Sequence, residues 1–249
     1  LNDNWNLGLT YRYSQVEAEY KFAAGSSAVE LKDLEATDAA GFRLGAQYKA
    51  DSEGWGLGFS YRSEVAFDAE GTATSIVIAD GTRNSLGDTT LSNALPAQYN
   101  LDTFYTLNDS WKLYGGLTFT EYSVNKQIDL KGTIAGSVPK ITQNWDDQWN
   151  YRLATSYHGI ENWELRGGYV LTSQVTDSKA ASPTFASPGE GHTFVVGAGT
   201  HCMDEKLHYD LALEYSMASG DGETAPPTSR KGEFSSAGTT VHLSAKYLF

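Results

Sequence analysis

Apolar and polar residues alternate along much of the chain, and the clearest example is its last eleven residues, 239–249. Val241, Leu243, Tyr247 and Phe249 share one parity, and Thr240, His242, Ser244 and Lys246 share the other. Such alternation predicts a β-strand with one apolar and one polar face. In a barrel immersed in lipid the outward face must be apolar while the interior can be wet. The segment is therefore typical of a transmembrane β-strand.

The same pattern recurs in other segments and predicts an all-β protein, an antiparallel transmembrane β-barrel of about ten strands. In one of them Trp55, Leu57, Phe59 and Tyr61 share the outward parity, and Arg62 has the inward parity. We expect residues 1–249 to form a single transmembrane β-barrel domain. The ten predicted strands are 4–22, 39–50, 54–70, 96–107, 110–131, 147–158, 162–174, 191–203, 206–218 and 237–249.

Short polar turns alternate with long connections between these segments. The five turns lie at 2–4, 52–54, 108–110, 160–162 and 204–206, and Trp follows the first four. The long polar connections lie at 23–38, 71–95, 132–146, 175–190 and 219–236. This asymmetry predicts short periplasmic turns and long extracellular loops. Amphipathic rings are favourable at a membrane interface, so the expected interface aromatics are Trp5, Trp55, Trp111, Trp163, Tyr247 and Phe249.

Composition narrows the choice without deciding it. A length of 249 residues and a mean hydropathy of -0.40 also fit a soluble β-sandwich binding module, which would bury the aromatic stripes between two sheets. The chain has no apolar run of about 18 residues, so a helical membrane span is excluded. A net charge of -13 argues against nucleic acid as a partner. No cleavable secretory segment starts at Leu1, so we expect a mature form or a fragment.

Charges of both signs have the inward parity. One interpretation is mutual pairing that fills a narrow interior, and the other is a polar pathway or binding surface for a solute. The candidate lumen residues include Arg12, Arg43, Arg62, Glu64, Arg152 and Arg166.

Catalytic chemistry has little support in the sequence. The five histidines, at 158, 192, 201, 208 and 242, stand without a nucleophile elbow or a repeated metal-ligand spacing. We therefore expect no enzyme, no catalytic residue, no metal site and no cofactor. An outer-membrane barrel enzyme of the phospholipase or protease type, and a general small porin, remain as alternatives.

Several motifs resemble the FadL/TodX (OMPP1) family of outer-membrane transporters. They are the run at 1–9, the stretch from Gly54 to Val65 that contains Tyr-Arg-Ser-Glu-Val, and the Leu95-Pro96 step. The resemblance implies passive uptake of long-chain fatty acids or other hydrophobic compounds across the outer membrane of Gram-negative bacteria. The implied partners are membrane lipid, a hydrophobic small-molecule ligand and the barrel-assembly machinery, which would recognise the C-terminal strand ending in Phe249.

The chain also departs from this family. Its members have fourteen strands and an amino-terminal hatch, and this chain is similar to the last ten strands only, so we expect the hatch and the first strands to be absent. Glu17 occupies a position where the family can place a ligand-contacting Arg. Lys126 and Lys131 then remain as candidates for holding an anionic head group. A fragment and a complete shortened barrel both fit this pattern.

Overall fold

A computed structural model describes residues 4–24, 26–50, 54–136, 140–176, 189–202, 206–223 and 231–248. Within these ranges the chain forms one antiparallel sheet of fourteen strands with two short 3-10 helices. No helix in them is long and apolar enough to cross a membrane. The elements are β1 (Trp5–Ala24), β2 (Ser27–Lys49), β3 (Trp55–Arg62), β4 (Val65–Val77), β5 (Arg83–Leu95), β6 (Gln98–Thr106), β7 (Trp111–Thr120), η1 (Tyr122–Asn125), β8 (Gln127–Gly132), η2 (Thr133–Gly136), β9 (Lys140–Thr142), β10 (Gln148–Ile160), β11 (Trp163–Thr172), β12 (Gly191–Cys202), β13 (Leu207–Glu223) and β14 (Lys231–Tyr247).

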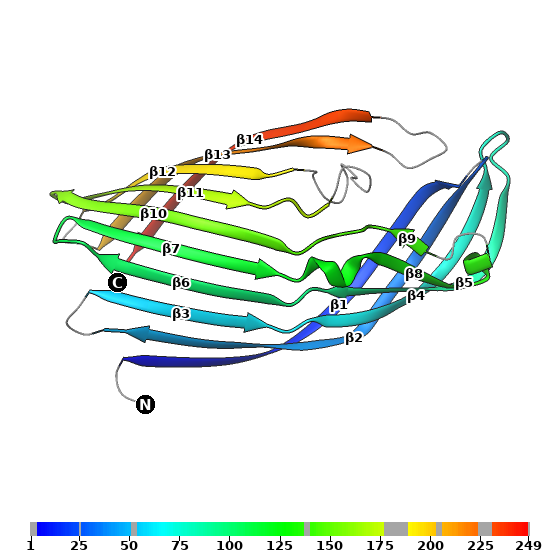
Figure 1. Cartoon of the computed structure of the whole chain (residues 1–249), viewed down its shortest axis with the longest axis horizontal. Coiled ribbons are helices and arrows are strands. Elements are labelled where there is room, and N and C mark those ends of the chain that lie inside the picture. The colour runs from blue at the N-terminus through cyan, green and yellow to red at the C-terminus, as the bar shows by residue number, and fades with distance from the viewer. Residues whose placement is uncertain are drawn as a thin grey trace.

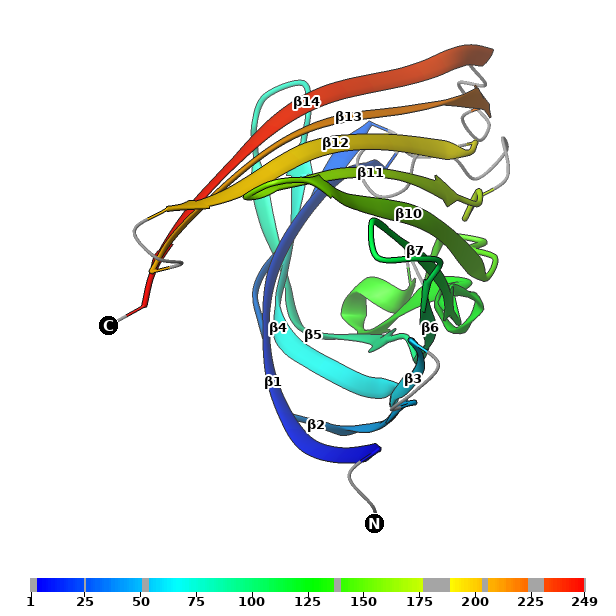
Figure 2. The same ribbon diagram turned by 90° about the vertical axis from the view of Figure 1, so that its left-hand side faces the viewer.

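The sheet follows the order β14-β13-β12-β11-β10-β7-β6-β3-β2-β4-β5-β8-β9, and β1 pairs with β2 (Figure 1). The long strand β2 pairs with β3 over residues 43–49 and with β4 over residues 27–35, so two shorter strands share one of its edges. The sheet curves strongly, but β1 and β14 do not pair with each other in the described part of the chain (Figure 2). The result is an open, half-wrapped wall.

The predicted all-β antiparallel fold is confirmed, but the predicted number of ten strands is wrong, and the described sheet is not closed into a barrel. The predicted strand 54–70 is divided at Ser63 and Glu64 into β3 and β4. Pro96 separates β5 from β6, because proline has no N–H to donate and restricts the residue before it. The predicted strand 110–131 is divided by η1 into β7 and β8.

Two of the predicted long loops are also wrong. Residues 26–38 and 71–95 are mostly strand, in β2, β4 and β5, and the 3-10 helix η2 and β9 lie within 132–146. Threonine and valine in these segments favour strands, although the segments as a whole are as polar as loops. In 219–236, β13 continues to Glu223 and β14 begins at Lys231. Most of the predicted loop 175–190 lies outside the described residues.

The buried core lies at the long-loop end of the sheet, where β1, β2, β4, β5 and β8 converge (Figure 1). Leu31, Leu34, Ile128 and Ile134 are almost fully buried there. Tyr20 and other side chains of β1 pack against this cluster. The long-loop end of the sheet is therefore stabilised by an apolar core. This core fixes the positions of the strands that converge there.

Along the rest of the sheet the large apolar side chains are exposed instead of buried. Leu9 is 76% exposed and Leu243 is 79% exposed, and many outward-parity residues resemble them. In the described ranges there is a single sheet, so these stripes are not enclosed between two layers. This arrangement contradicts the soluble β-sandwich alternative.

Candidate functional site

Tight turns place an aromatic residue at the start of several strands. Asn108 accepts hydrogen bonds at its side-chain oxygen from the backbone N–H of Ser110 (3.0 Å) and of Trp111 (2.9 Å). In the next described turn of this kind, Ile160 pairs with Trp163, and Asn162 has φ of 60°. Asn tolerates this left-handed conformation, which is common in tight turns. The turn residues 2–3, 52–53 and 204–205 lie outside the described residues.

The tryptophans after these turns lie in a row at the short-turn end of the sheet, which we call the lower girdle. Trp5, Trp111, Trp163 and Tyr247 are between 40% and 49% exposed. The rings of Trp5 and Tyr48 are 5.1 Å apart, and those of Tyr48 and Trp55 are 5.2 Å apart. Phe249, the remaining predicted interface aromatic, lies outside the described residues.

A second row, the upper girdle, was not predicted from the sequence. Its rings come from five strands, β2, β3, β6, β7 and β10, and each ring contacts the next. The centroid distances along the row are 5.8, 4.9, 6.0 and 4.7 Å. The residues are Phe42, Tyr61, Tyr99, Phe119 and Trp149. The sequence did contain a signal for this row. Each of these strands has a second aromatic residue of the same parity, six to eight residues from its lower-girdle aromatic.

The opposite, concave face carries a polar network around Arg152 of β10. Its guanidinium donates to Asp102 on β6 at 2.8 Å and to the Thr118 hydroxyl on β7 at 2.5 Å. Thr118 in turn donates to Asn100 at 2.7 Å, and Asn100 donates to Ser60 at 3.1 Å. Arg152 therefore lies on the inward face, as predicted. There it belongs to a chain of hydrogen bonds that crosses four strands.

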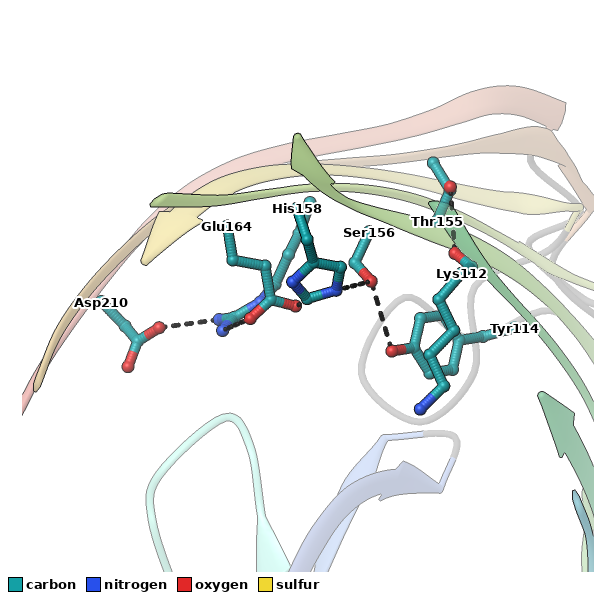
Figure 3. Close-up of polar contacts among 8 residues, drawn as sticks. Lys112, Tyr114, Thr155, Ser156, His158, Glu164 and Asp210 are labelled. Carbon is teal, nitrogen blue, oxygen red and sulfur yellow. Dashed lines mark hydrogen bonds and ion pairs between the residues drawn. The ribbon is translucent and has the colours of Figure 1, made fainter. Parts of the chain in front are cut away.

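A second network surrounds Arg166 of β11 on the same face. Arg166 donates to Glu164 and to Asp210, both at 2.7 Å, so one guanidinium bridges two carboxylates. His158 of β10 lies 3.7 Å from Glu164. Figure 3 shows Glu164, His158 and Asp210 pointing from the sheet into the space that it encloses. In the part of the sheet from β10 to β13, the inward charges therefore pair with one another, as the first interpretation of the sequence expects.

Ser156, His158 and Glu164 have the residue types of a catalytic triad without its geometry. The Ser156 hydroxyl lies 3.0 Å from Nε2 of His158, and Glu164 approaches that same nitrogen (Figure 3). A relay needs the carboxylate on the other ring nitrogen, where it would orient the base. Ser156 is also only 1% exposed and contacts the Tyr114 hydroxyl at 3.3 Å. The carboxylate is therefore misplaced for a catalytic relay, although Ser156 borders the cavity described next.

A cavity of about 600 Å³, which these charges help to line, extends along the sheet from β7 to β14. Its inward-parity lining combines small apolar residues with charged or titratable ones, which are Arg152, Glu164, Arg166, Asp210 and His242. A volume of this size fits a drug-sized molecule. The small apolar lining residues are Ala154, Gly168, Val170, Val195, Gly197 and Ala212.

The remaining predicted lumen residues lie near the opposite edge of the sheet and at the long-loop end. Arg12, Arg43 and Arg62 share the concave face of β1, β2 and β3, and Arg43 is paired directly with Arg62 in the register. Glu64 lies exposed in the break between β3 and β4. The predicted lumen arginines therefore form two separate groups. Arg152 and Arg166 lie in the networks with carboxylates described above, and the other three lie on β1, β2 and β3.

Lys126 and Lys131, the predicted head-group ligands, lie above the upper girdle. Lys126 is exposed between η1 and β8. Lys131 of β8 forms an ion pair with Asp68 of β4 at 3.5 Å. A hydrogen bond from the Ser92 hydroxyl, and then the charge of Lys131, hold the pKa of Asp68 below its usual value. Lys131 therefore already has an anionic partner within the protein.

The sequence is similar to one described family over nearly its whole length. Residues 1–246 match the family "Outer membrane protein transport protein (OMPP1/FadL/TodX)". The long-chain fatty acid transport protein of Salmonella typhi is 21% identical over 247 residues, which cover 86% of this chain and 56% of that protein. The protein of the same name from Escherichia coli K12 is 21% identical over 187 residues, 70% of this chain and 41% of that protein. The chain thus spans about half the length of these curated relatives.

Solved structures resemble the fold. A FadL homologue of Pseudomonas aeruginosa superimposes with a TM-score of 0.78 at 19% identity, over 99% of this chain and 65% of that one. The toluene transporter TodX of Pseudomonas putida superimposes with a TM-score of 0.66 at 15% identity, over 100% of this chain and 67% of that one. At such identities these structures support the fold alone.

Proposed function

Because the chain belongs to the OMPP1/FadL/TodX family of outer membrane transport proteins, we propose that it contributes to passive uptake of long-chain fatty acids or similar hydrophobic compounds. It is an outer-membrane protein of the type found in Gram-negative bacteria, and its family consists of channels for hydrophobic compounds, not enzymes. The relatives named for long-chain fatty acids are 21% identical, so this substrate is part of the proposal.

One observation carries the proposal, namely the difference between the two faces of the same strands. The outward face has exposed leucines between two aromatic girdles, which suits contact with lipid. The inward face of β10 to β13 borders the cavity with small apolar residues and has hydrogen-bonding groups near them. An apolar solute could lie against such a wall while the polar groups keep contact with water.

The predicted lumen residues have roles within this proposal. Arg152 and Arg166, with their carboxylates, keep the wall of the pathway in a fixed shape. Arg12, Arg43 and Arg62, with Glu64, line the other side, and Lys126 and Lys131 lie nearer the long-loop end. We further propose that residues 1–249 act as one transmembrane domain with its long-loop end outside the cell.

Two partners follow from the same surfaces. Membrane lipid would contact the exposed stripes between the girdles. The barrel-assembly machinery would bind the C-terminal strand β14, whose outward residues include Leu243 and Tyr247.

Uptake tests the proposal best where spontaneous entry is blocked. The protein is produced in a Gram-negative strain without its own long-chain fatty acid transporter, and entry of radiolabelled palmitate across the lipopolysaccharide leaflet is measured. We expect faster entry than in the same strain with an empty vector. Equal rates would refute transport of fatty acids. Entry of small sugars at a comparable rate would favour the general small porin instead.

A further inference from the structure

Two histidines face each other across β12 and β13 at the short-turn end of the sheet. His201 of β12 and His208 of β13 are direct partners in the antiparallel register. Side chains at directly paired positions share one face, and their Cβ atoms are about 4.5–5.5 Å apart. The centroids of the two imidazole rings are 5.8 Å apart, and the ring planes are inclined by 45°. Backbone pairing itself therefore brings the two rings together.

The histidine pair lies on the concave face of the sheet. The next pair of the same parity is Gly199 and Asp210, and Asp210 points into the space that the sheet encloses (Figure 3). Both histidines are half-buried. An ion from the surrounding water can therefore reach them, although they belong to the inner wall.

Both histidines line a second cavity of about 410 Å³, which we call the lower cavity. It extends from β12 and β13 to the turn before β11. The Thr200 hydroxyl donates to the Asn162 carbonyl at 2.8 Å and holds β12 against this turn. The histidine pair thus lies in a polar recess with a fixed wall.

The charges around the lower cavity favour a cation. Its lining has three carboxylates, which belong to Glu161, Glu164 and Asp210, and one guanidinium, which belongs to Arg166. Lys246 of β14 is the register partner of His208 and adds a second positive charge beside the cavity. Negative charges still outnumber positive ones, so the local field attracts a cation more than an anion.

The spacing of the two rings suits a shared metal ion. A bond from histidine nitrogen to zinc is about 2.0–2.1 Å long, so each ring centroid would lie about 3.2 Å from the ion. Two rings on one ion can then be at most about 6.4 Å apart, and a tetrahedral angle places them about 5.2 Å apart. The observed 5.8 Å lies between these values. Small rotations of the side chains are therefore enough to form a chelate.

We propose that His201 and His208 chelate a divalent transition-metal ion at the lower end of the concave face. In the part of the chain that the structure describes, no group of three or more His, Cys, Asp or Glu side chains is placed to hold a metal ion. The site therefore supplies two imidazoles and leaves the other coordination positions to water. Imidazole suits zinc, nickel and copper, and of these Cu²⁺ binds a given site most tightly.

Asp210 supports the site through its charge. Its Oδ1 accepts a hydrogen bond from Arg166 at 2.7 Å, which fixes its side chain two positions along β13 from His208. This proposal departs from the expectation of no metal site, which was based on the spacing of histidines along the sequence. Six residues separate His201 from His208, and only the β12–β13 register makes them neighbours.

Copper binding to the purified, tag-free protein in detergent tests the site. All measurements use a Cys202→Ser background, because this exposed thiol could bind or reduce Cu²⁺. Affinity is measured by titration of Cu²⁺ at pH 7.5, and the ligands are identified by electron paramagnetic resonance. We expect one ion per chain, with coupling to two imidazole nitrogens. Zn²⁺ in excess should displace it.

Substitution of either histidine should remove the chelate. We expect His201→Gln and His208→Gln each to weaken Cu²⁺ binding by at least about tenfold, since even the outer partners of metal ligands are worth about 10- to 100-fold in affinity. Each variant should also lose the coupling to one nitrogen. A purely structural role of these residues would not change the nitrogen coupling.

Two other histidines provide matched controls. His192 lies 2.7 Å from the Tyr169 hydroxyl, and His242 lies 3.6 Å from Glu214. His192→Gln and His242→Gln should leave the affinity and the spectrum unchanged. Heat-modifiable migration in gels shows first that every variant is folded.

The outcomes decide the inference without reference to uptake. If the folded His201→Gln and His208→Gln proteins bind Cu²⁺ as tightly as the parent, or the parent spectrum shows no coupling to two nitrogens, the site is refuted. An equal loss in His242→Gln would also refute it, because the ion would then be held elsewhere. Failure of palmitate entry into cells would leave the metal site standing, since the site does not rest on the proposed function.

Discussion

A charge placed on the outward face of β13 should destabilise the protein far more than the same charge on its inward face. Leu213 is outward and 46% exposed, and its neighbour Ala212 lines the cavity. We compare Leu213→Arg with Ala212→Arg. The two substitutions introduce the same side chain one residue apart, so they differ mainly in the face of the sheet on which it lies.

The structure gives the expected size of the effect. The outward face of β13 has the aromatic residues Tyr209 and Tyr215 on either side of Leu213, and the six residue steps between them, at about 3.3 Å each, span about 20 Å of strand. At a tilt of about 40° this is about 15 Å along the membrane normal, and Leu213 lies within about 3 Å of its middle. Arginine near the bilayer midplane costs about 2–4 kcal/mol, or roughly 30- to 1000-fold in the folding equilibrium. At position 212, Asp210 and Glu214 share the inward face, so we expect a cost below about 1 kcal/mol.

The assay is equilibrium unfolding in phospholipid vesicles, followed by tryptophan fluorescence as denaturant is added. The free energy of unfolding is compared for the original protein and the two variants under the same lipid composition. A cost for Leu213→Arg that is equal to or smaller than the cost for Ala212→Arg would refute the assignment of this stripe to lipid.

Three further predictions concern the interior and the long-loop end. Leu34→Ala removes a fully buried side chain from the core, so it should cost about 2–5 kcal/mol and make the long-loop end more sensitive to protease, with the girdle region still resistant. Asp102→Asn and Arg152→Gln should couple by less than about 1 kcal/mol in a double-mutant cycle of unfolding, because both groups are partly exposed; a larger coupling would mean a drier lumen. The pKa of Asp68 is lowered in the folded protein, chiefly by the Ser92 hydroxyl, so its contribution to stability is present above the unfolded-state pKa and is lost as pH falls through the lower folded pKa. Protection of the β4–β5 hairpin against hydrogen exchange, taken relative to the intrinsic exchange rate at each pH, should therefore fall below about pH 3.8, and Asp68→Asn should remove that part of the pH dependence.

Strand parity could be predicted from the sequence because it depends on local alternation alone. Trp111 and Leu243 are exposed as that alternation predicts, and Arg152 lies on the opposite face. The number of strands could not be obtained in this way. The breaks at Ser63 and beside Pro96 interrupt β-ladders, and a ladder depends on pairing with distant segments.

The candidate site was only partly predictable for a related reason. Inward parity identifies Arg43 and Arg166 equally, yet Arg166 has two carboxylate partners and Arg43 has none in the described part of the chain. This difference depends on which strands are neighbours, and on the register that places Arg62 opposite Arg43. A single sequence gives each strand's faces but does not give the pairing between strands.

The unbroken contact among the upper-girdle rings has a mechanical consequence. Because Phe42 touches Tyr61, and contact continues through Tyr99 and Phe119 to Trp149, no one of the five strands can slide along its axis without separating a ring pair. A bilayer of a different thickness would therefore be met by tilting of this wall as a unit, or by thinning of the lipid around it. The contacting rings therefore keep strands that are far apart in the chain at one common depth in the membrane.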